Sequence, residues 1–313
     1  MNEDEQRRLA DYLSSQRGEP IKILDVRRLS VGHSRAMHRV ETDGGTFVVR
    51  VEQGGVFGTS SGEEFGIMRG LAAAGYPVAP ALWYESTGDV LGQPFFVMGF
   101  VEGAEPADER AMDEATAADF VRTLAELHTI DWAAVAITPE IVPGSPSEAT
   151  HLQIDRWADI YRSAAPQPIP LLEEAAAWLH RHAPPLDRIS IVHGDAGPGN
   201  VVQADGRIVA VTDWEFAHLG DPAEDWSFCL AMRGARTMPR ETWLALFERV
   251  AGVRLDEQTW TYWEAFNLFK GACANTTCLA VFESGANRAP NMAIIGTVLQ
   301  RSFLRRLVEL VVP

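Results

Sequence analysis

A glycine-rich loop between two short apolar segments constrains the fold of this sequence more than any other feature. The loop reads His193-Gly-Asp-Ala-Gly-Pro-Gly-Asn200 and follows the apolar run Ile189–Val192. Such a density of glycine and proline excludes the interior of a helix or a strand. The run before it is short and rich in β-branched residues, which predicts a buried strand. The loop therefore presents His193, Asp195 and Asn200 at fixed offsets from the end of that strand.

A predicted β-hairpin follows the loop and ends beside a second acidic residue. Residues 201–202 and Ile208–Val211 have strand character, and the turn between them is formed by residues 204–206, Ala-Asp-Gly. Asp213 lies just beyond the second strand. Because Asp195 and Asp213 each follow a strand, and a hairpin joins the two strands, we expect both carboxylates at one edge of the fold.

The acidic and amide side chains of this region suit phosphoryl transfer. Mg²⁺ takes oxygen ligands, usually only one or two of them from the protein and the rest from water and phosphate. Phosphoryl transfer needs a base near the acceptor hydroxyl, metal on the phosphates and close positioning of both. We therefore predict that Asp195 is the catalytic base and that Asn200 and Asp213 are the magnesium ligands.

The same residues resemble the catalytic loop of the aminoglycoside phosphotransferase-like, or choline-kinase-like, superfamily, which shares the protein-kinase fold. Asp213-Trp-Glu stands where that family has its metal-binding aspartate, and Leu219–Asp225 resembles the family's Gly-Asp-Pro-x-x-Asp segment. Within the superfamily, the sequence most resembles the subgroup related to the kinase-like domains of acyl-CoA dehydrogenase family proteins.

The resemblance implies an α+β, two-lobed protein-kinase-like fold. A small β-rich N-terminal lobe over residues 1–101 would bind the nucleotide. A larger, mainly helical C-terminal lobe over residues 102–313 would carry the catalytic loop and the acceptor pocket.

The N-terminal part of the sequence has the order expected of a flap that covers a nucleotide. A strand candidate at Ile21–Leu29 precedes a small-residue turn, and two further strands follow as a hairpin. Backbone N–H groups around Gly32 and Ser34 are predicted to approach phosphate oxygens. A single glycine is also compatible with an ordinary turn, and the sequence leaves that alternative open.

Arg50 lies inside a valine-rich strand, where a charge is costly unless it is paired. A predicted helix near residues 61–74 places Glu64 on the same face as Met68 and Leu71. By resemblance, an Arg50–Glu64 pair would match the kinase ion pair of a strand lysine and a helix glutamate, and Arg50 would hold phosphates. Arginine stands here in place of lysine, and the two are not equivalent. The alternative is a strand charge that points to solvent.

The apolar strand near Pro94–Phe100 resembles the strand that leads into the kinase hinge. Residues 101–103 would then be the hinge, whose backbone groups can pair with an adenine edge. Met98 and Phe100 are accordingly predicted to bind the nucleotide, and the lobe boundary is expected here.

Other side chains are expected to shape the site rather than to react. His193 is predicted to bond the backbone of its loop, and His128 to pack at the end of a helix that begins near residue 113. Asp221 and Asp225 should brace the loop and the next helix, with Asp221 as the N-cap before a proline. Further helices are predicted near residues 151–164, 170–182, 222–233, 240–251, 257–284 and 290–312, and a loop over the Pro/Ser-rich residues 138–150.

Composition and charge exclude several kinds of partner. The chain has 313 residues and a formal net charge of −16, which argues against nucleic acid or an anionic membrane as a partner. No apolar run is long enough to cross a bilayer, and the polar N-terminus lacks a signal-peptide pattern. The three cysteines have no metal-ligand spacing, and Cys273 and Cys278 are expected as buried thiols. We therefore expect a cytoplasmic protein; the oligomeric state is not predicted.

The C-terminal segment bears on the acceptor. Residues 240–313 contain seven acidic and eight basic residues, whereas the resemblance implies that kinases of polycationic aminoglycosides line this region with carboxylates. The segment is also rich in aromatic residues, which favours an apolar or aromatic hydroxyl compound, or a hydroxyacyl thioester. Arg233 and Arg236 are either contacts for an anionic group on such an acceptor or ordinary surface charges.

These features predict a phosphotransferase that uses ATP or GTP, with Mg²⁺, to phosphorylate a hydroxyl group of a small molecule. One alternative is an aminoglycoside or choline-type amino-alcohol kinase. Another, of a different class, is a non-catalytic nucleotide-binding pseudokinase, although such proteins usually lack the base or a metal ligand. A metallophosphoesterase would need several further His and Asp ligands, and the eight histidines of the chain form no such set.

Overall fold

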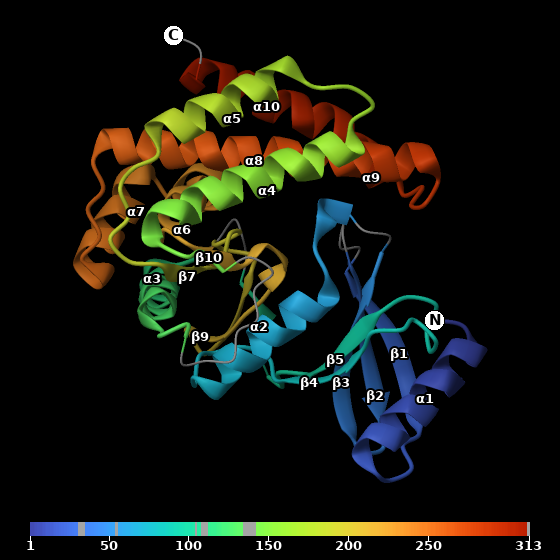
Figure 1. Ribbon diagram of the computed structural model, residues 1–313. Coiled ribbons are helices and arrows are strands. Elements are labelled where there is room, and N and C mark those ends of the chain that lie inside the picture. Colours follow the sequence, from blue (N-terminus) through green and yellow to red (C-terminus); the bar gives the residue numbers. More distant parts are fainter. Residues whose placement is uncertain (31–34, 54–55, 104, 108–111, 134–141, 312–313) are drawn as a thin grey trace.

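The computed structural model describes residues 1–30, 35–53, 56–103, 105–107, 112–133 and 142–311. Figure 1 shows a twisted β-sheet with two helices in the N-terminal part and a larger, mainly helical C-terminal part. The α+β, two-lobed kinase-like fold predicted from the sequence is therefore confirmed.

The N-terminal sheet has five antiparallel strands in the order β1-β2-β3-β5-β4. The strands are β1 (Ile23–Ser30), β2 (Arg35–Thr42), β3 (Gly45–Glu52), β4 (Ala81–Glu85) and β5 (Phe95–Gly99), and the helices are α1 (Glu3–Arg17) and α2 (Ser61–Ala73). A short 3₁₀ turn, η1 (Val56–Gly58), precedes α2.

The two faces of this sheet are buried by different partners, as the period-two alternation of side chains requires. Phe95 and Val97 of β5 pack with Leu9 and Leu13 of α1. Phe96 and Met98, which point to the opposite face, belong to the core that α2 shares with the C-terminal part. The second face therefore joins the two parts of the molecule through a continuous apolar core.

A short β-structure carries the glycine-rich loop between the sheet and the helices. Strand β7 (Ser190–Val192) pairs with β10 (His218–Gly220), and β8 (Val201–Ala204) pairs with β6 (Glu105–Pro106) and β9 (Arg207–Val211). The predicted hairpin is present. Asp205 and Gly206 at its turn both have positive φ, as a primed two-residue turn requires.

Helices make up the rest of the C-terminal part (Figure 1). They are α3 (Glu114–Thr129), α4 (Pro146–Ala164), α5 (Pro170–His182), α6 (Ala223–Phe228), α7 (Arg240–Leu246), α8 (Glu257–Ser284), α9 (Pro290–Ile294) and α10 (Gln300–Val311). Helix α8 is the centre of this part, because it packs against α4, α5, α6 and α10 and is buried along most of its length. None of the helices over the described ranges is long and apolar enough to cross a membrane.

The helical prediction differs from the structure in two details. The predicted loop over residues 138–150 ends earlier, because α4 begins at Pro146, a residue suited to the first turn of a helix. The helices predicted over 222–233 and 240–251 are present but each ends in a π-helical turn, whereas the helix predicted over 290–312 is interrupted by one. These turns are Cys229–Arg233, Phe247–Ala251 and Ile295–Leu299.

Candidate functional site

Asp225 holds the backbone at the start of the glycine-rich loop. Its carboxylate accepts the N–H groups of His193 over 2.8 Å and Gly194 over 2.9 Å, and it contacts His128 Nε2 at 3.0 Å. Burial works to raise the pKa of Asp225, but the hydrogen bonds from His128 and from the backbone of His193 outweigh it and hold the pKa below its ordinary value. Asp225 thus braces the loop as predicted, and His128 supports Asp225.

Lys270 holds the same loop from the other side. Its Nζ donates to the carbonyl oxygen of Gly194 over 2.6 Å and to Glu224 Oε1 over 2.5 Å. Both charged side chains are buried, and Glu224 also faces His218 Nε2 at 3.1 Å. The sequence did not predict this contact, since a lone lysine within a long apolar helix gives no signal of a partner 76 residues away.

Gly194 cannot be replaced by a larger residue at this point of the loop. Its φ is +78°, and a Cβ there would lie 2.4 Å from the carbonyl oxygen of Phe216. Only glycine satisfies both the left-handed backbone and the close approach.

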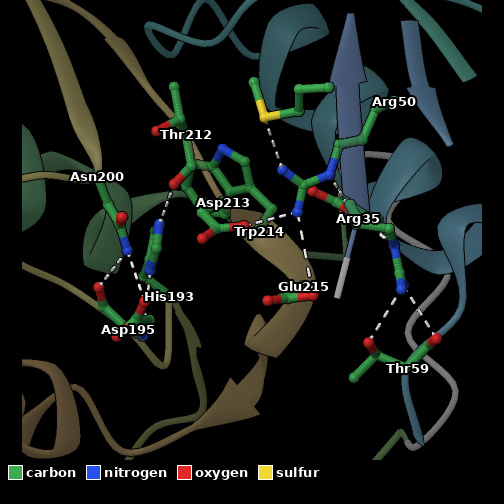
Figure 2. Close-up of polar contacts among 12 residues, drawn as sticks. Arg35, Arg50, Thr59, His193, Asp195, Asn200, Thr212, Asp213, Trp214 and Glu215 are labelled. Carbon is green, nitrogen blue, oxygen red and sulfur yellow. Dashed lines mark hydrogen bonds and ion pairs between the residues drawn. The ribbon is translucent and has the colours of Figure 1, made fainter. Parts of the chain in front are cut away.

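His193 connects the loop to the segment that carries Asp213, as Figure 2 shows. Its Nε2 lies 2.9 Å from the carbonyl oxygen of Thr212, and its Nδ1 lies 3.2 Å from the backbone nitrogen of Asp195. A carbonyl only accepts and an N–H only donates, so the neutral tautomer with the proton on Nε2 satisfies both contacts. His193 therefore has the structural role predicted for it.

Asn200 fixes the side chain of Asp195. Its Nδ2 donates to the carbonyl oxygen of Asp195 over 2.9 Å and to Asp195 Oδ2 over 2.6 Å (Figure 2). Both residues are buried. Because the nitrogen of the amide faces Asp195, the amide oxygen of Asn200 is left to face other ligands.

Asp213 is held in a backbone conformation that is rare for residues other than glycine. It has φ 66° and ψ 57°, in the left-handed region that aspartate tolerates better than most residues. The neighbouring Thr212 N–H donates to the carbonyl oxygen of Asn200 over 2.9 Å. The turn therefore starts beside the loop of Asp195, and the predicted meeting of these two segments is present.

The predicted Arg50–Glu64 pair is present, with Arg50 Nε 3.1 Å from Glu64 Oε2. Arg50 also donates through Nη2 to Asp213 Oδ1 over 2.6 Å, a contact that the sequence did not predict (Figure 2). Burial opposes ionisation of Asp213, but the charge and hydrogen bond of Arg50 hold the pKa of that carboxyl below its ordinary value. Arg50 is buried, which removes the alternative of a charge that points to solvent.

Two further charged residues of this cluster were missed. Arg35 is buried and donates through Nη2 to the carbonyl oxygen and hydroxyl of Thr59 over 3.0 and 3.2 Å, and its Nε lies 4.0 Å from Glu64. Glu215 Oε2 lies 4.0 Å from Arg50 Nη2, and burial together with the charge of Asp213 raises the pKa of Glu215 to about 8. Arg35 could have been found by the same signal as Arg50, a charged residue in a strand of alternating apolar residues. Glu215 could have been found as part of the Asp-Trp-Glu motif.

Arg233 lies directly against Asp195. Its Nε donates to Asp195 Oδ1 over 3.2 Å, and its Nη2 donates to Asp195 Oδ2. The sequence left Arg233 as either a contact for an anionic group of the acceptor or a surface charge, and it did not predict this ion pair. The proposed base is thus paired with a cation that comes from the π-helical turn after α6.

The structure does not test the nucleotide-binding role predicted for four other residues, Gly32, Ser34, Met98 and Phe100. Gly32 and Ser34 lie outside the described residues. The side chain of Met98 is buried in the shared core. The amide of Phe100 donates to the carbonyl oxygen of Thr46 over 3.4 Å, and its ring lies under the guanidinium of Arg39. A nucleotide role for Met98 and Phe100 therefore stays a prediction.

The aromatic residues of the C-terminal segment are core rather than pocket wall, which corrects one argument about the acceptor. The buried members are Trp243, Phe247, Trp260, Tyr262, Trp263, Phe266 and Phe269, and Phe282 is partly buried. Their number reflects the packing of two apolar cores and says nothing about an acceptor.

The oxygen atoms of Asn200 and Asp213 suit Mg²⁺, which takes few ligands from the protein, better than a metal ion whose ligands all come from protein side chains. Over the part of the chain that the structure describes, no group of three or more His, Cys, Asp or Glu side chains is arranged to hold a metal ion. The amide oxygen of Asn200 and the carboxylate of Asp213, whose side chain is 33% exposed, could supply two hard oxygen ligands. This fits an ion that keeps water and phosphate as its other ligands. The three cysteines are buried free thiols, as predicted for Cys273 and Cys278.

The two-part fold with this loop defines a protein-kinase-like phosphotransferase class. The chain belongs to the phosphotransferase enzyme family known as APH, whose family model matches residues 25–266. Among curated proteins, human acyl-CoA dehydrogenase family member 11 is 25% identical over 324 residues, covering 93% of this chain and 41% of the relative. Mouse acyl-CoA dehydrogenase family member 10 is 32% identical over 177 residues, covering 54% of this chain and 16% of the relative. The chain thus spans less than half the length of these relatives.

Solved structures share the fold over nearly the whole chain. A Ralstonia eutropha protein provisionally assigned as an aminoglycoside phosphotransferase has a TM-score of 0.70 and 24% identity, with 97% of each chain covered. The choline kinase LicA of Streptococcus pneumoniae has a TM-score of 0.67 and 15% identity, with 97% of this chain and 98% of LicA covered. LicA has been solved with AMP, and the aminoglycoside phosphotransferase APH(4)-Ia with ADP and hygromycin B.

Proposed function

We propose that this protein transfers the γ-phosphoryl group of a nucleoside triphosphate, ATP or GTP, to a hydroxyl group of a small molecule. The observation that carries the proposal is the joint arrangement of Asp195, Asn200 and Asp213. Asn200 holds the carboxylate of Asp195, and His193 ties the loop of Asp195 to the turn of Asp213. Structures with the same fold bind AMP and ADP, which supports a nucleotide as one substrate.

Asp195 is proposed as the base. The Asn200 bond to Oδ2 fixes the carboxylate, so that a lone pair of Oδ1 can accept the proton of an acceptor hydroxyl. In the same step the acceptor oxygen bonds to the γ-phosphorus, and the bond from that phosphorus to the bridging oxygen of the nucleotide breaks. The products are a phosphate monoester and a nucleoside diphosphate.

Asn200 and Asp213 are proposed to hold Mg²⁺ through the amide oxygen and a carboxylate oxygen. Bound there, the ion would neutralise charge on the β- and γ-phosphates of the nucleotide. Arg50 would contact phosphate oxygens, and Glu64 fixes the orientation of Arg50 through the bond at 3.1 Å. Gly32, Ser34, Met98 and Phe100 are proposed to bind the nucleotide, with residues 1–101 as the nucleotide lobe and 102–313 as the acceptor lobe.

The acceptor is proposed to be an uncharged or anionic hydroxyl compound, such as a hydroxyacyl compound, rather than an aminoglycoside. The support comes from Arg233, a cation in contact with the proposed base, beside which a polycationic acceptor would be repelled. The similarity to acyl-CoA dehydrogenase family members agrees with a hydroxyacyl compound.

A nucleotide-consumption screen tests the proposal. The purified protein, with Mg²⁺ and ATP or GTP, is assayed against alcohols, sugars, amino alcohols, aminoglycosides and hydroxyacyl thioesters. We expect turnover with at least one hydroxyl compound, formation of its phosphate monoester, and loss of that turnover in Asp195→Asn. Tight nucleotide binding without turnover over this panel would favour the pseudokinase instead.

A further inference from the structure

Arg233 covers the carboxylate that the proposed reaction needs as its base. Asp195 Oδ2 accepts hydrogen bonds from both Asn200 and Arg233, and Asp195 Oδ1 accepts one from Arg233 Nε over 3.2 Å. A carboxylate has about four lone-pair sites, so one site on Oδ1 is left for an acceptor hydroxyl. Arg233 therefore does not block the base, but it lies next to the atom that receives the proton.

The fold places Arg233 there through two local features. The stem of Arg233 lies over Gly197 in the loop, where a Cβ on Gly197 would stand 2.6 Å from Arg233 Cβ. Arg233 is the last residue of a π-helical turn, Cys229–Arg233. The backbone hydrogen bonds of such a turn join residues five apart, instead of four apart as in an α-helix. Such turns are rare and occur often at functional sites.

The charge of Arg233 acts on both carboxylates of the site. It contacts Asp195 directly, and it is among the cations that hold the pKa of Asp213 below its ordinary value. The side chain of Arg233 is 26% exposed, whereas that of Arg50 is 6% exposed. Of these two arginines, Arg233 is therefore the more accessible to an incoming group.

In the proposed reaction, a phosphoryl group moves from the nucleotide toward Asp195, the carboxylate that Arg233 contacts. It leaves the nucleotide on the Asp213 side and reaches the acceptor oxygen on the Asp195 side, with negative charge on its equatorial oxygens. A guanidinium fork matches phosphate geometry, and it is always protonated.

We infer that Arg233 is a catalytic residue that moves from Asp195 to the γ-phosphoryl group and neutralises its charge during transfer. The inference rests on the proposed function. No proton or electron passes through Arg233, because the acceptor proton goes to Asp195 and the nucleoside diphosphate leaves. In other phosphoryl-transfer proteins, an arginine in this role contributes about 10³–10⁵-fold to kcat.

Nucleotide binding tests the inference without an identified acceptor. Titration calorimetry with Mg²⁺ compares ADP with AMPPNP, a non-hydrolysable ATP analogue that keeps the γ-phosphoryl group. We expect Arg233→Met to weaken the affinity for AMPPNP by about 10-fold or more, as loss of a charge-assisted contact implies. The affinity for ADP, which lacks the γ-phosphoryl group, should change by less than about 2-fold. Arg236→Met makes the same change three residues on and should alter neither affinity.

A second variant separates the phosphoryl contact from the contact with Asp195. Asp195→Asn removes the carboxylate that holds Arg233, so AMPPNP should bind more tightly, and this gain should vanish when Arg233→Met is added. Arg233→Lys keeps the charge without the fork; it should weaken AMPPNP less than Arg233→Met does, and it serves if the methionine variant does not fold. Equal effects on ADP and AMPPNP, or none, would overturn the role of Arg233. If the wild-type protein bound neither nucleotide, the proposed function itself would fail.

Discussion

Arg50 Nη2 and Asp213 Oδ1 lie 2.6 Å apart and join strand β3 of the N-terminal sheet to the turn after β9. The same guanidinium contacts Glu64 of α2 through Nε. Arg50 thus joins three segments, and one of them, the turn of Asp213, lies 163 residues further along the chain. The contact uses one oxygen of the Asp213 carboxylate, so the second oxygen is the one proposed to bind the metal. The position of Arg50 depends on both Glu64 and Asp213.

The first prediction concerns the coupling of Arg50 and Glu64. Arg50→Ala and Glu64→Ala should each raise the KM for nucleotide about 10-fold or more, since each removes a charge-assisted contact or the residue that orients it. The double variant should be little worse than Arg50→Ala alone. Arg27→Ala, an exposed arginine of β1 that pairs with Asp25, is the control and should leave KM unchanged. Additive losses in this double-mutant cycle would mean that the two residues act independently.

The fold was largely predictable because its signals are local. Alternation of apolar residues located the strands, and the turn at Asp205 and Gly206 identified the hairpin. The π-helical turns were not predictable, since no residue pattern distinguishes Cys229–Arg233 from a continued α-helix.

The part of the candidate site formed by residues close together in the sequence was predictable. Asp195, Asn200 and Asp213 are close in sequence, and Glu64 followed from helical spacing after Arg50. The contacts of Lys270 with Gly194 and of Arg233 with Asp195 cross 76 and 38 residues. Tertiary packing alone brings these pairs together, so the spacing of residues along the sequence could not predict the contacts.

The second prediction concerns the base. Asp195→Asn should lower kcat by at least about 10²-fold while nucleotide still binds, because a positioned general base contributes roughly 10²–10⁴-fold. Steady-state kinetics with the acceptor found by the screen gives kcat, and calorimetry gives nucleotide affinity. Asp205→Asn, the same change at the exposed hairpin turn, should retain full activity. A wild-type rate in Asp195→Asn would exclude this residue as the base.

The third prediction separates the two proposed metal ligands. Asp213→Asn keeps the shape of the side chain and tolerates the left-handed backbone at φ 66°, so its effect reports the lost charge. It should weaken the Mg²⁺ dependence of nucleotide binding more than Asn200→Ala, because a carboxylate supplies charge to the cation and an amide only a dipole. The measurement is a Mg²⁺ titration of ATP affinity in both variants. An unchanged Mg²⁺ dependence in Asp213→Asn would remove this residue from the site.

The fourth prediction uses the lowered pKa of Asp225. Because the pKa is lower in the folded protein than in the unfolded chain, ionised Asp225 stabilises the fold above the unfolded value of about 4. This stabilisation is lost as the pH falls through the folded value. Asp225→Asn should therefore destabilise the protein by about 3 kcal/mol at pH 7, as expected for a broken buried pair. The difference from wild type should shrink as the pH falls below about 4.

Chemical denaturation between pH 7 and the acid range measures this difference. Asp187→Asn, at an exposed position, is the control and should track the wild type at each pH. A difference between Asp225→Asn and wild type that stayed constant in acid would mean that the charge of Asp225 does not stabilise the loop.

The last prediction concerns the acceptor. Aminoglycosides carry several positive charges and need carboxylates around the reacting hydroxyl, but here the proposed base already contacts Arg233, and residues 240–313 contain seven acids against eight bases. We therefore expect kanamycin-type aminoglycosides to be poor acceptors, and expression of the protein to leave the minimum inhibitory concentration of kanamycin unchanged. The control strain expresses Asp195→Asn, which should show the same susceptibility as the wild-type strain. Phosphorylation of such a compound with kcat/KM above about 10⁴ M⁻¹s⁻¹, the lower end for true enzyme substrates, would restore the aminoglycoside kinase as the better assignment.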